Sequence, residues 1–406
     1  MAAPSSALHS TDSLTWRARV REFGSVVCMS TADIDAPLWT NKQHVAIRLA
    51  QEVPTLYVES LGLRTPRMSR RDLARAARRL AGRRSILPRG LPSGFQVTSP
   101  LVVPYWGVPG VARLNRALLR YQLAPQIARL ARPRLLLAYS PIAAWLAQSG
   151  EFDAVAYHCV DDLATQPRMP ARFIRGLEVQ LATAATAVFA SAPALEEALL
   201  PSNPRTYLTP NVCDWEHFSQ ATRPGPLPAE LEVIPRPRAL FVGALSDYKV
   251  DWTLLGQVAR CLQDWSFVFV GPPGDEQRPT GRESIAGLSN CHFLGWRPLE
   301  SVPSFMRGAD VGLLPYVLSE HTRSVFPLKT MEYLSAGLPV VATRLESLVL
   351  QPDLPVYLAA GAEEFAAALQ TVDSSDDARL ERSAFASTKT WDSLLDRILD
   401  VMTESS

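Results

Sequence analysis

The stretch RALFVGALSDYKVDWTLL, residues 238–255, holds the pattern on which the fold assignment rests. An apolar run ends at Gly243, a short polar loop with Lys249 follows, and a helix is predicted from about Asp251. A strand that passes through a glycine turn into a helix is typical of a βαβ unit. Glycine lets a ligand approach the backbone, and a helix amino terminus beside an ammonium favours phosphate. An ordinary turn with a solvated lysine explains the stretch as well.

The same alternation of strand and helix patterns extends over the rest of the chain. The first half has strand candidates at 25–29, 55–59, 95–99, 134–139, 154–160, 186–191 and 206–210. The second half has them at 238–245, 266–271, 291–295, 311–316 and 339–343. Helical patterns such as 41–51, 109–131 and 171–185 separate most of these runs. We therefore predict an α/β protein with two Rossmann-like domains that face each other across a ligand cleft.

The length of 406 residues exceeds what one hydrophobic core usually spans, which also favours two domains. A stretch rich in proline separates the two sets of strands, and we interpret it as a linker. The predicted organisation is a disordered tail over 1–20, an amino-terminal domain over 21–210, a linker over 211–237, a carboxyl-terminal domain over 238–385 and a final helix over 386–406 that crosses back to the first domain.

Composition and missing motifs exclude several classes of protein. The net charge of +1 gives no global sign of nucleic-acid binding, and we expect no nucleic-acid partner. Five scattered cysteines without CxxC spacing indicate reduced thiols. The opening residues lack a secretory signal pattern, so we expect a cytoplasmic protein. Neither GxGxxG nor GxxxxGK[ST] occurs, which argues against a nicotinamide enzyme or a P-loop kinase.

Lysine is scarce in this chain. The 41 basic residues include only four lysines: Lys42, Lys249, Lys329 and Lys389. Because arginine supplies the generic surface charge, a retained lysine suggests a need for a compact ammonium. Lys329 and Glu332 share one face of a helix predicted over 329–336. A bare ion pair at this spacing contributes only about 0.3 kcal/mol, whereas an ammonium on phosphate and a carboxylate on ribose hydroxyls would use both groups.

Four segments between residues 238 and 345 together resemble the carboxyl-terminal domain of GT-B-fold glycosyltransferases of family 4, in particular the teichuronic-acid-type branch. The segments are FVGALSDYKVDWTLL, SFVFVGPPG, HFLGWRPLESVPSFMRGADVGLLPY and HTRSVFPLKTMEYLSAGLPVVAT. PNVCDWEHF is similar to the interdomain stretch of that family, and PLWTNKQHVAIRLA and AYHCVDD resemble amino-terminal features of the branch. The resemblance covers most of residues 20–400.

This resemblance implies a glycosyltransferase of hexosyltransferase type with a nucleotide-diphosphate sugar as co-substrate and no other cofactor. The second domain would hold the donor, and the first would hold a polysaccharide or lipid-linked glycan acceptor. Lys249 matches the family lysine at the donor phosphates, and Glu332 matches the glutamate at the ribose. Lys329 falls beside the pyrophosphate, and the glycines that end two strands, Gly243 and Gly271, complete the predicted donor site.

The chain departs from the family pattern at three points. Ser324 stands where the family commonly has a glutamate that contacts the donor sugar. Ala244 stands where an arginine often follows the first glycine, and we predict that Arg323 supplies the missing charge. Val212 replaces a glycine of the interdomain stretch. These departures leave the identity of the sugar open. Two rival functions stay open: a GT-B nucleotide-sugar epimerase, and a catalytically silent protein that binds glycan or acts as a scaffold, which Ser324 and Ala244 motivate.

Asp161 and Asp162 follow a strand of the first domain and are the predicted catalytic residues. An inverting enzyme would need one of them as a general base. A retaining enzyme, which the resemblance suggests, would pass the acceptor proton to the departing phosphate. The acids would otherwise cap the next helix. We interpret His158 as a strand residue satisfied by its neighbours.

The loop and helix after the first strand hold further candidates. Asp33 and Asp35 form a DxD-like stretch, but the GT-B interpretation predicts no metal site. The four residues expected either to grip the acceptor or to pack and cap locally are Trp39, Asn41, Lys42 and His44.

Residues 64–89 carry ten arginines and one acid, with an apolar stripe at Leu73, Ala76, Ala77 and Leu80. Such a helix is able to lie on an anionic membrane, so we predict peripheral association with the inner face of the plasma membrane. A solvated charged helix or attraction to nucleic acid remains the alternative.

Overall fold

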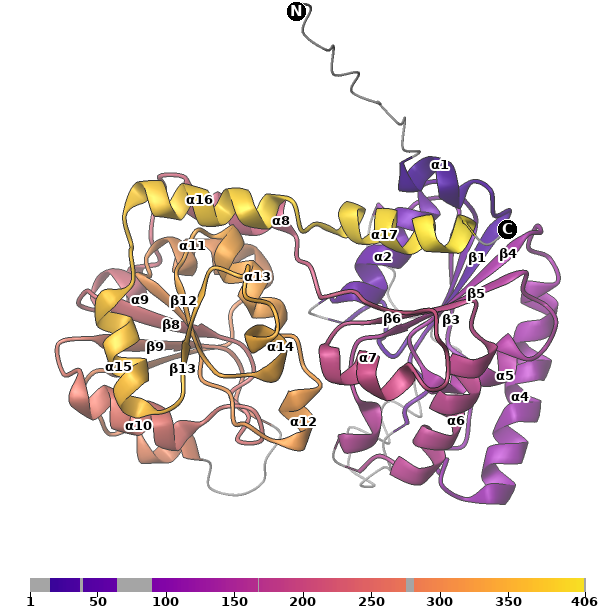
Figure 1. The fold of residues 1–406 in the computed structure, drawn as a ribbon, viewed down its shortest axis with the longest axis horizontal. Coiled ribbons are helices and arrows are strands. Elements are labelled where there is room, and N and C mark those ends of the chain that lie inside the picture. The colour runs from indigo at the N-terminus through magenta and orange to yellow at the C-terminus, as the bar shows by residue number, and fades with distance from the viewer. Residues whose placement is uncertain (1–14, 37–38, 64–89, 167, 275–280, 405–406) are drawn as a thin grey trace, which may run out of the picture.

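A computed structural model of the protein describes residues 15–36, 39–63, 90–166, 168–274 and 281–404. These residues form two parallel β-sheets in two lobes, with helices packed on both faces of each sheet (Figure 1). The predicted basic helix over 64–89 lies outside the described residues.

The first sheet has seven parallel strands in the order β3-β2-β1-β4-β5-β6-β7. Its strands are β1 Ser25–Met29, β2 Thr55–Val58, β3 Phe95–Thr98, β4 Arg134–Ala138, β5 Ala154–Cys159, β6 Ala187–Ala190 and β7 Thr206–Leu208. The first strand, β1, lies inside the sheet. Strands β2 and β3 extend the sheet on one side of it, and β4 to β7 extend it on the other. Ligands of such sheets bind where this switch occurs, at the carboxyl ends of the strands.

The second sheet has six parallel strands in the order β10-β9-β8-β11-β12-β13. Its strands are β8 Arg238–Val242, β9 Ser266–Val270, β10 Cys291–Gly295, β11 Val311–Leu314, β12 Val340–Thr343 and β13 Val356–Ala359. The switch point lies between β8 and β11. Strands β8, β9, β11 and β12 are buried along their whole length, as continuous apolar runs covered on both faces must be. The predicted α/β fold class is confirmed.

The predicted linker over 211–237 is wrong for most of its length. The segment contains the short helices α8 Trp215–Phe218 and α9 Ala229–Glu232. Its apolar side chains, including Phe218 and Leu231, are buried in the core of the second domain. Prolines make this backbone irregular, but the apolar residues between them still bury their surface against the domain.

The predicted disordered tail over 1–20 is wrong at its carboxyl end. Residues Trp16–Val20 form helix α1, and both named side chains are buried. The helix packs on α17, Trp391–Thr403, which follows α16, Asp376–Ser387, and lies on the first domain (Figure 1). Arg17 reinforces this contact, because it pairs with Asp392 at 3.3 Å. The two ends of the described chain therefore stabilise each other.

The packing of α17 on the first domain includes an aromatic stack. The ring of His44, in helix α2, Asn41–Ala50, stacks on Trp391 with centroids 4.8 Å apart and planes 10° from parallel. Burial, with a smaller contribution from the nearby Arg48 charge, lowers the pKa of His44 to about 4. The imidazole is therefore neutral in the folded protein at pH values where the unfolded chain binds a proton.

This stack predicts a loss of stability in mild acid. Because the folded pKa of His44 lies below the unfolded value of 6.5, its contribution is complete above that value and declines as the pH falls toward 4. Between pH 7 and pH 5 the wild type should lose about 2 kcal/mol of unfolding free energy from this group. In His44→Phe the loss of unfolding free energy between pH 7 and pH 5 should be smaller by this amount. Denaturant unfolding at the two pH values measures it. His292→Phe changes a less buried ring whose pKa burial also lowers, so it should remove a smaller share of the loss. Equal slopes for wild type and His44→Phe would contradict the assignment.

Candidate active site

Two glycines end neighbouring strands of the second sheet in close contact. Gly243 follows β8 and Gly271 follows β9, with φ of +150° and +156°. The Gly243 N–H donates to the Val270 carbonyl at 2.8 Å. A Cβ on Gly271 would lie 1.8 Å from the Gly243 carbonyl oxygen. No side chain fits there, so the two loops require glycine for steric reasons.

Lys329 lies across Gly243. A Cβ on Gly243 would come within 2.4 Å of Lys329 Cε and 3.2 Å of Nζ. Lys329 belongs to the first turn of helix α13, Leu328–Ser335, whose positive dipole end adds to the ammonium charge. Glu332 follows on the same face, with its Oε2 4.0 Å from Lys329 Nζ, and both side chains keep part of their surface exposed. The site therefore offers an ammonium, a helix amino terminus and a carboxylate side by side.

Tyr333 holds this arrangement together, and the sequence analysis did not predict this role. Its hydroxyl accepts a hydrogen bond from the Val242 N–H at 2.8 Å, at the end of β8. Its ring lies over Gly312, where a Cβ would be 2.5 Å from the ring. Burial holds the pKa of Tyr333 well above its usual value, so the hydroxyl stays neutral. The sequence trace of this contact is Gly312, a glycine inside β11. Its partner Tyr333 lies in another element, so no local pattern predicts the contact.

Lys249 lies in the loop after β8, and that loop is joined to the loop after β11. The Lys249 carbonyl accepts from the Val317 N–H at 2.8 Å, and Val250 bridges Tyr316 in antiparallel fashion. Burial, and next the Glu332 carboxylate, raise the pKa of Tyr316, which places Glu332 near the same loop. The structure thus brings both Lys249 and Glu332 near residues 316–317.

Arg323 is exposed but already paired, and Ser324 is buried. Arg323 donates to Glu346 at 2.7 Å and to Glu197 of the first domain at 3.2 Å. A role for Arg323 at a donor would require these ion pairs to open. Ser324 is buried at the end of the short helix α12, Glu320–Arg323.

The two predicted catalytic acids have different environments. Asp162 caps the turn after β5 by accepting from the Ala164 N–H at 3.0 Å, and its other oxygen pairs with Arg175 at 2.5 Å. The capping alternative therefore describes Asp162. Asp161 is more exposed, and its Oδ2 lies 3.9 Å from Nζ of Lys42. Asp161 is the acid of this pair that remains available to a ligand.

His158 lies beneath α2 in the interior of the first domain. It is fully buried, and its Nδ1 contacts the Tyr139 hydroxyl at 3.3 Å. Burial, and then the charge of Lys42, lower its pKa to about 3. The neutral, buried ring fits a strand residue. The expectation that its neighbours satisfy it is wrong for Nε2, which has no hydrogen-bond partner among the described residues.

Three of the four residues expected either to grip an acceptor or to pack locally make local contacts. Trp39 donates to the Ile34 carbonyl at 3.1 Å, and His44 stacks on Trp391 as described above. Asn41 donates to Asn211 at 2.7 Å. Lys42 is largely buried beside Asp161. A role of these residues at an acceptor stays a prediction.

The DxD-like stretch contributes to local structure. The Asp33 carbonyl accepts from the Gln43 side chain at 3.1 Å, which ties the loop to the start of α2. Within the described part of the chain, no three or more His, Cys, Asp or Glu side chains gather in a group suited to a metal ion.

Direct contacts join the two domains near these groups. Thr165, after β5, and His321, after β11, are hydrogen-bonded at 3.2 Å. Asn211 links the domains a second time, because it accepts from Asn41 and donates to the Phe326 carbonyl at 2.8 Å, just before α13. Helices α7, Pro193–Leu199, and α14, Glu346–Val349, pack together at the same junction (Figure 1). The carboxyl ends of the two sheets therefore face each other.

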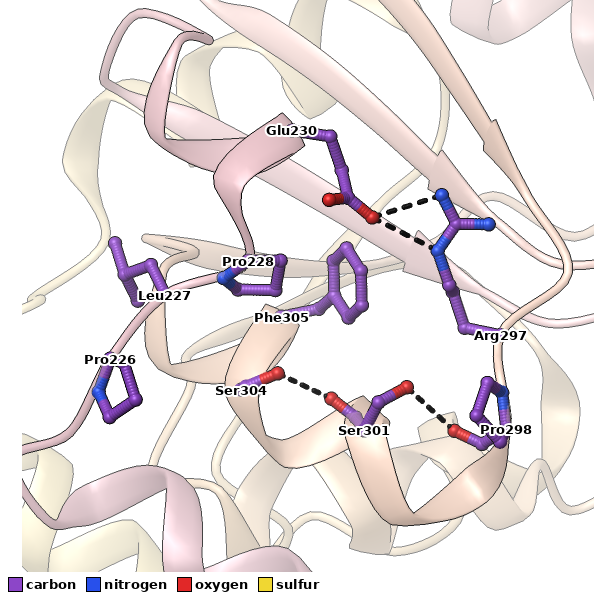
Figure 2. Close-up of a pocket in the computed structure, with 9 residues that line it drawn as sticks. All are labelled: Pro226, Leu227, Pro228, Glu230, Arg297, Pro298, Ser301, Ser304 and Phe305. Atoms are coloured by element: carbon purple, nitrogen blue, oxygen red, sulfur yellow. Dashed lines mark hydrogen bonds and ion pairs between the residues drawn. The ribbon is translucent and has the colours of Figure 1, made fainter.

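An open pocket of about 380 Å³ lies elsewhere on the second domain (Figure 2). Its wall is mostly apolar, with Phe305 at the centre, and an ion pair between Glu230 and Arg297 at 2.9 Å closes one side. None of the predicted donor residues lines this pocket. It is thus separate from the site at the sheet edges.

Comparison with known proteins shows what the second domain is similar to. Residues 236–373 match the family "Glycosyl transferases group 1". The chain is 32% identical over 165 residues to "Putative teichuronic acid biosynthesis glycosyltransferase TuaH" of Bacillus subtilis (strain 168). That match covers 39% of this chain and 41% of the relative, so it spans about two fifths of each.

Solved structures agree along almost the whole chain. HepE from Anabaena in complex with UDP superposes with a TM-score of 0.64 at 16% identity, covering 94% of this chain and 99% of HepE. Sucrose-phosphate synthase from Thermosynechococcus elongatus gives 0.61 at 17% identity, covering 93% and 94%. At such low sequence identities, the structural similarity establishes the fold alone. The fold is GT-B, and the resemblance to family 4-like glycosyltransferases that the sequence suggested is confirmed.

The contact between Lys329 and the glycines predicts a specific pattern of stability. Gly243→Ala meets only the flexible end of Lys329, whereas Gly271→Ala meets backbone, so Gly271→Ala should be the more destabilising change in denaturant unfolding. Backbone strain alone should cost about 1–3 kcal/mol at each position. In a Lys329→Ala background the Gly243→Ala cost should fall by about 1 kcal/mol, because the steric conflict is gone. The Gly271→Ala cost should not change, and a Gly243→Ala cost equal in both backgrounds would refute the contact.

Proposed function

We propose that this protein is a glycosyltransferase that moves a sugar from a nucleotide-diphosphate sugar to a polysaccharide or lipid-linked glycan. The observation that carries the proposal is the placement of Lys329 over Gly243 at the amino terminus of α13, with Glu332 4.0 Å from the ammonium. The helix terminus and the ammonium suit a diphosphate, and the carboxylate suits ribose hydroxyls. Lys249 adds a second cation from the neighbouring loop.

Uridine diphosphate is the nucleotide we infer for the donor. HepE was solved with UDP and with UDP-glucose, and its fold matches this chain over nearly its full length. The name of TuaH, which refers to teichuronic acid biosynthesis, supports an envelope polysaccharide as the acceptor class. The donor is a co-substrate, and the reaction needs no further cofactor.

We further propose transfer with retention of the anomeric configuration. An inverting enzyme needs a carboxylate that is free to take the acceptor proton. Of the two candidates, Asp162 is held by Ala164 and Arg175, and Asp161 faces the Lys42 ammonium. Asp161 and Lys42 are then placed to orient acceptor hydroxyls, and the departing phosphate receives the proton. This part of the proposal rests on the environments of the two acids.

We place the enzyme in the cytoplasm or on the inner face of the plasma membrane, where lipid-linked acceptors are found. None of the helices in the described ranges has the length and apolarity required to cross a membrane. The basic segment 64–89 stays the predicted contact with an anionic leaflet, on the strength of its sequence.

A thermal-shift screen against UDP, GDP, TDP, ADP and CMP tests the donor assignment. We expect UDP to raise the melting temperature of the wild type most, because only the folded state binds it. Lys249→Ala, Lys329→Ala and Glu332→Ala should each reduce the UDP shift, by an amount that reflects about tenfold weaker binding or more. Lys389→Ala removes an exposed lysine near the start of α17 and is the matched control.

Equal UDP shifts in the wild type and all three site variants would refute the site. Sugar transfer that requires an added acceptor separates a transferase from an epimerase, which needs none. Absence of any donor turnover would favour a silent glycan-binding protein. The anomeric configuration of the product, read by NMR, tests retention.

A further inference from the structure

Helix α4, Pro109–Ile127, has an ordinary inner face. Its buried side chains recur every three or four residues and pack into the core of the first domain; they are Ala112, Asn115, Leu119, Leu123 and Ile127. This face accounts for the apolar periodicity of the sequence.

The outer face of the same helix is also apolar, which is unusual for a surface helix. Leu114 and Tyr121 point outward at a spacing of seven residues, with 49% and 81% of their surface exposed. Ala117 and Ala124 are also exposed and fall on the same face. A helix that is covered on one side only would normally present charged or polar residues here.

The loop that leads into α4 continues this surface. Leu101, Tyr105 and Val108 are large apolar residues that are exposed just before the helix begins. We call Leu101, Tyr105, Val108, Leu114 and Tyr121 the α4 patch. In Figure 1, α4 lies on the side of the first domain that is remote from the second domain. A partner on this side would leave the candidate active site open.

The charged residues of α4 itself are all of one sign. Arg113, Arg116 and Arg120 are exposed along one flank of the helix. Helix α4 and the loop that leads into it, residues 99–127, contain these three arginines and neither aspartate nor glutamate. An apolar stripe with arginines along its side is the pattern of a helix that lies in a membrane interface. Tyrosine, whose ring is apolar and whose hydroxyl is polar, favours the same depth.

We propose that the α4 patch and its three flanking arginines form a docking surface for an anionic lipid bilayer. A second copy of the chain fits this surface less well, because a two-fold contact through α4 would bring arginines against arginines. An anionic bilayer would bury the apolar residues and attract the three arginines. This surface is distinct from residues 64–89. It deepens the membrane placement of the proposed function and rests on that placement.

Vesicle flotation of the full chain tests the proposal. The probes are phosphatidylcholine vesicles with and without phosphatidylglycerol. We expect the wild type to float with the anionic vesicles and to stay behind with the neutral ones, with binding weakened by added salt. Leu114→Glu/Tyr121→Glu should lower the partition coefficient by about tenfold or more, because two apolar anchors are lost and two like charges are added. Arg113→Gln/Arg116→Gln/Arg120→Gln should lower it by about 100-fold.

Matched controls are Val233→Glu and Leu380→Glu, which change exposed apolar residues of the second domain. Both should float like the wild type, and the melting temperatures of all variants should confirm that they fold. Flotation of the α4 variants equal to wild type, or no flotation of the wild type, would overturn the proposal. A dimer in sedimentation velocity that Leu114→Glu/Tyr121→Glu dissolves would also overturn it, since the patch would then bind a second copy. UDP shifts are measured in parallel, so that failure of docking and failure of the donor site are distinguished.

Discussion

The passage of the Lys329 side chain over the Cα of Gly243 is the contact on which the site depends. It is possible only because β8 ends in a residue without a side chain, and because Gly271 lets the next loop approach within contact distance. The Tyr333 hydroxyl then fastens the end of β8 to the helix that carries Lys329. Strand, loop and helix are thus fixed relative to one another before any ligand arrives. A preorganised cation at a helix amino terminus binds phosphate without a cost of rearrangement.

The second constraint is the junction between the domains. Asn211 is hydrogen-bonded to α2 of the first domain and to the carbonyl that precedes α13 of the second. The starts of these two helices carry Lys42 and Lys329, two of the four lysines in the chain. This buried amide is therefore one of the contacts that set how the starts of α2 and α13 approach each other. Both of these lysines lie beside a carboxylate at a sheet edge, Lys42 beside Asp161 and Lys329 beside Glu332.

Sequence patterns predicted the sheets well because parallel strands buried on both faces are continuous apolar runs. They missed β13, which lies at the sheet edge and is only partly buried, so its apolar run is short. They also treated proline as a sign of a linker, although Phe218 and Leu231 in that stretch belong to a core. The packing of α1 on α17 joins residues nearly 400 positions apart, and no local pattern reports such a contact.

Sequence patterns likewise predicted some residues of the candidate site and missed others. Spacing along one helix placed Lys329 and Glu332 together, and the glycines that end β8 and β9 were found as strand terminators. The sequence could not separate Asp161 from Asp162, because their difference depends on Arg175 and Lys42 from other helices. It could not find Tyr333, whose partners Val242 and Gly312 lie on two separate strands.

A crystal structure of the protein with UDP would locate the nucleotide relative to these groups. We predict that the diphosphate lies against Gly243, with Lys329 Nζ about 3 Å from a phosphate oxygen, and that Glu332 accepts from the ribose hydroxyls. Nucleotide density in the pocket around Phe305, or anywhere that leaves Lys329 and Glu332 without contact to it, would show that the donor site is assigned wrongly.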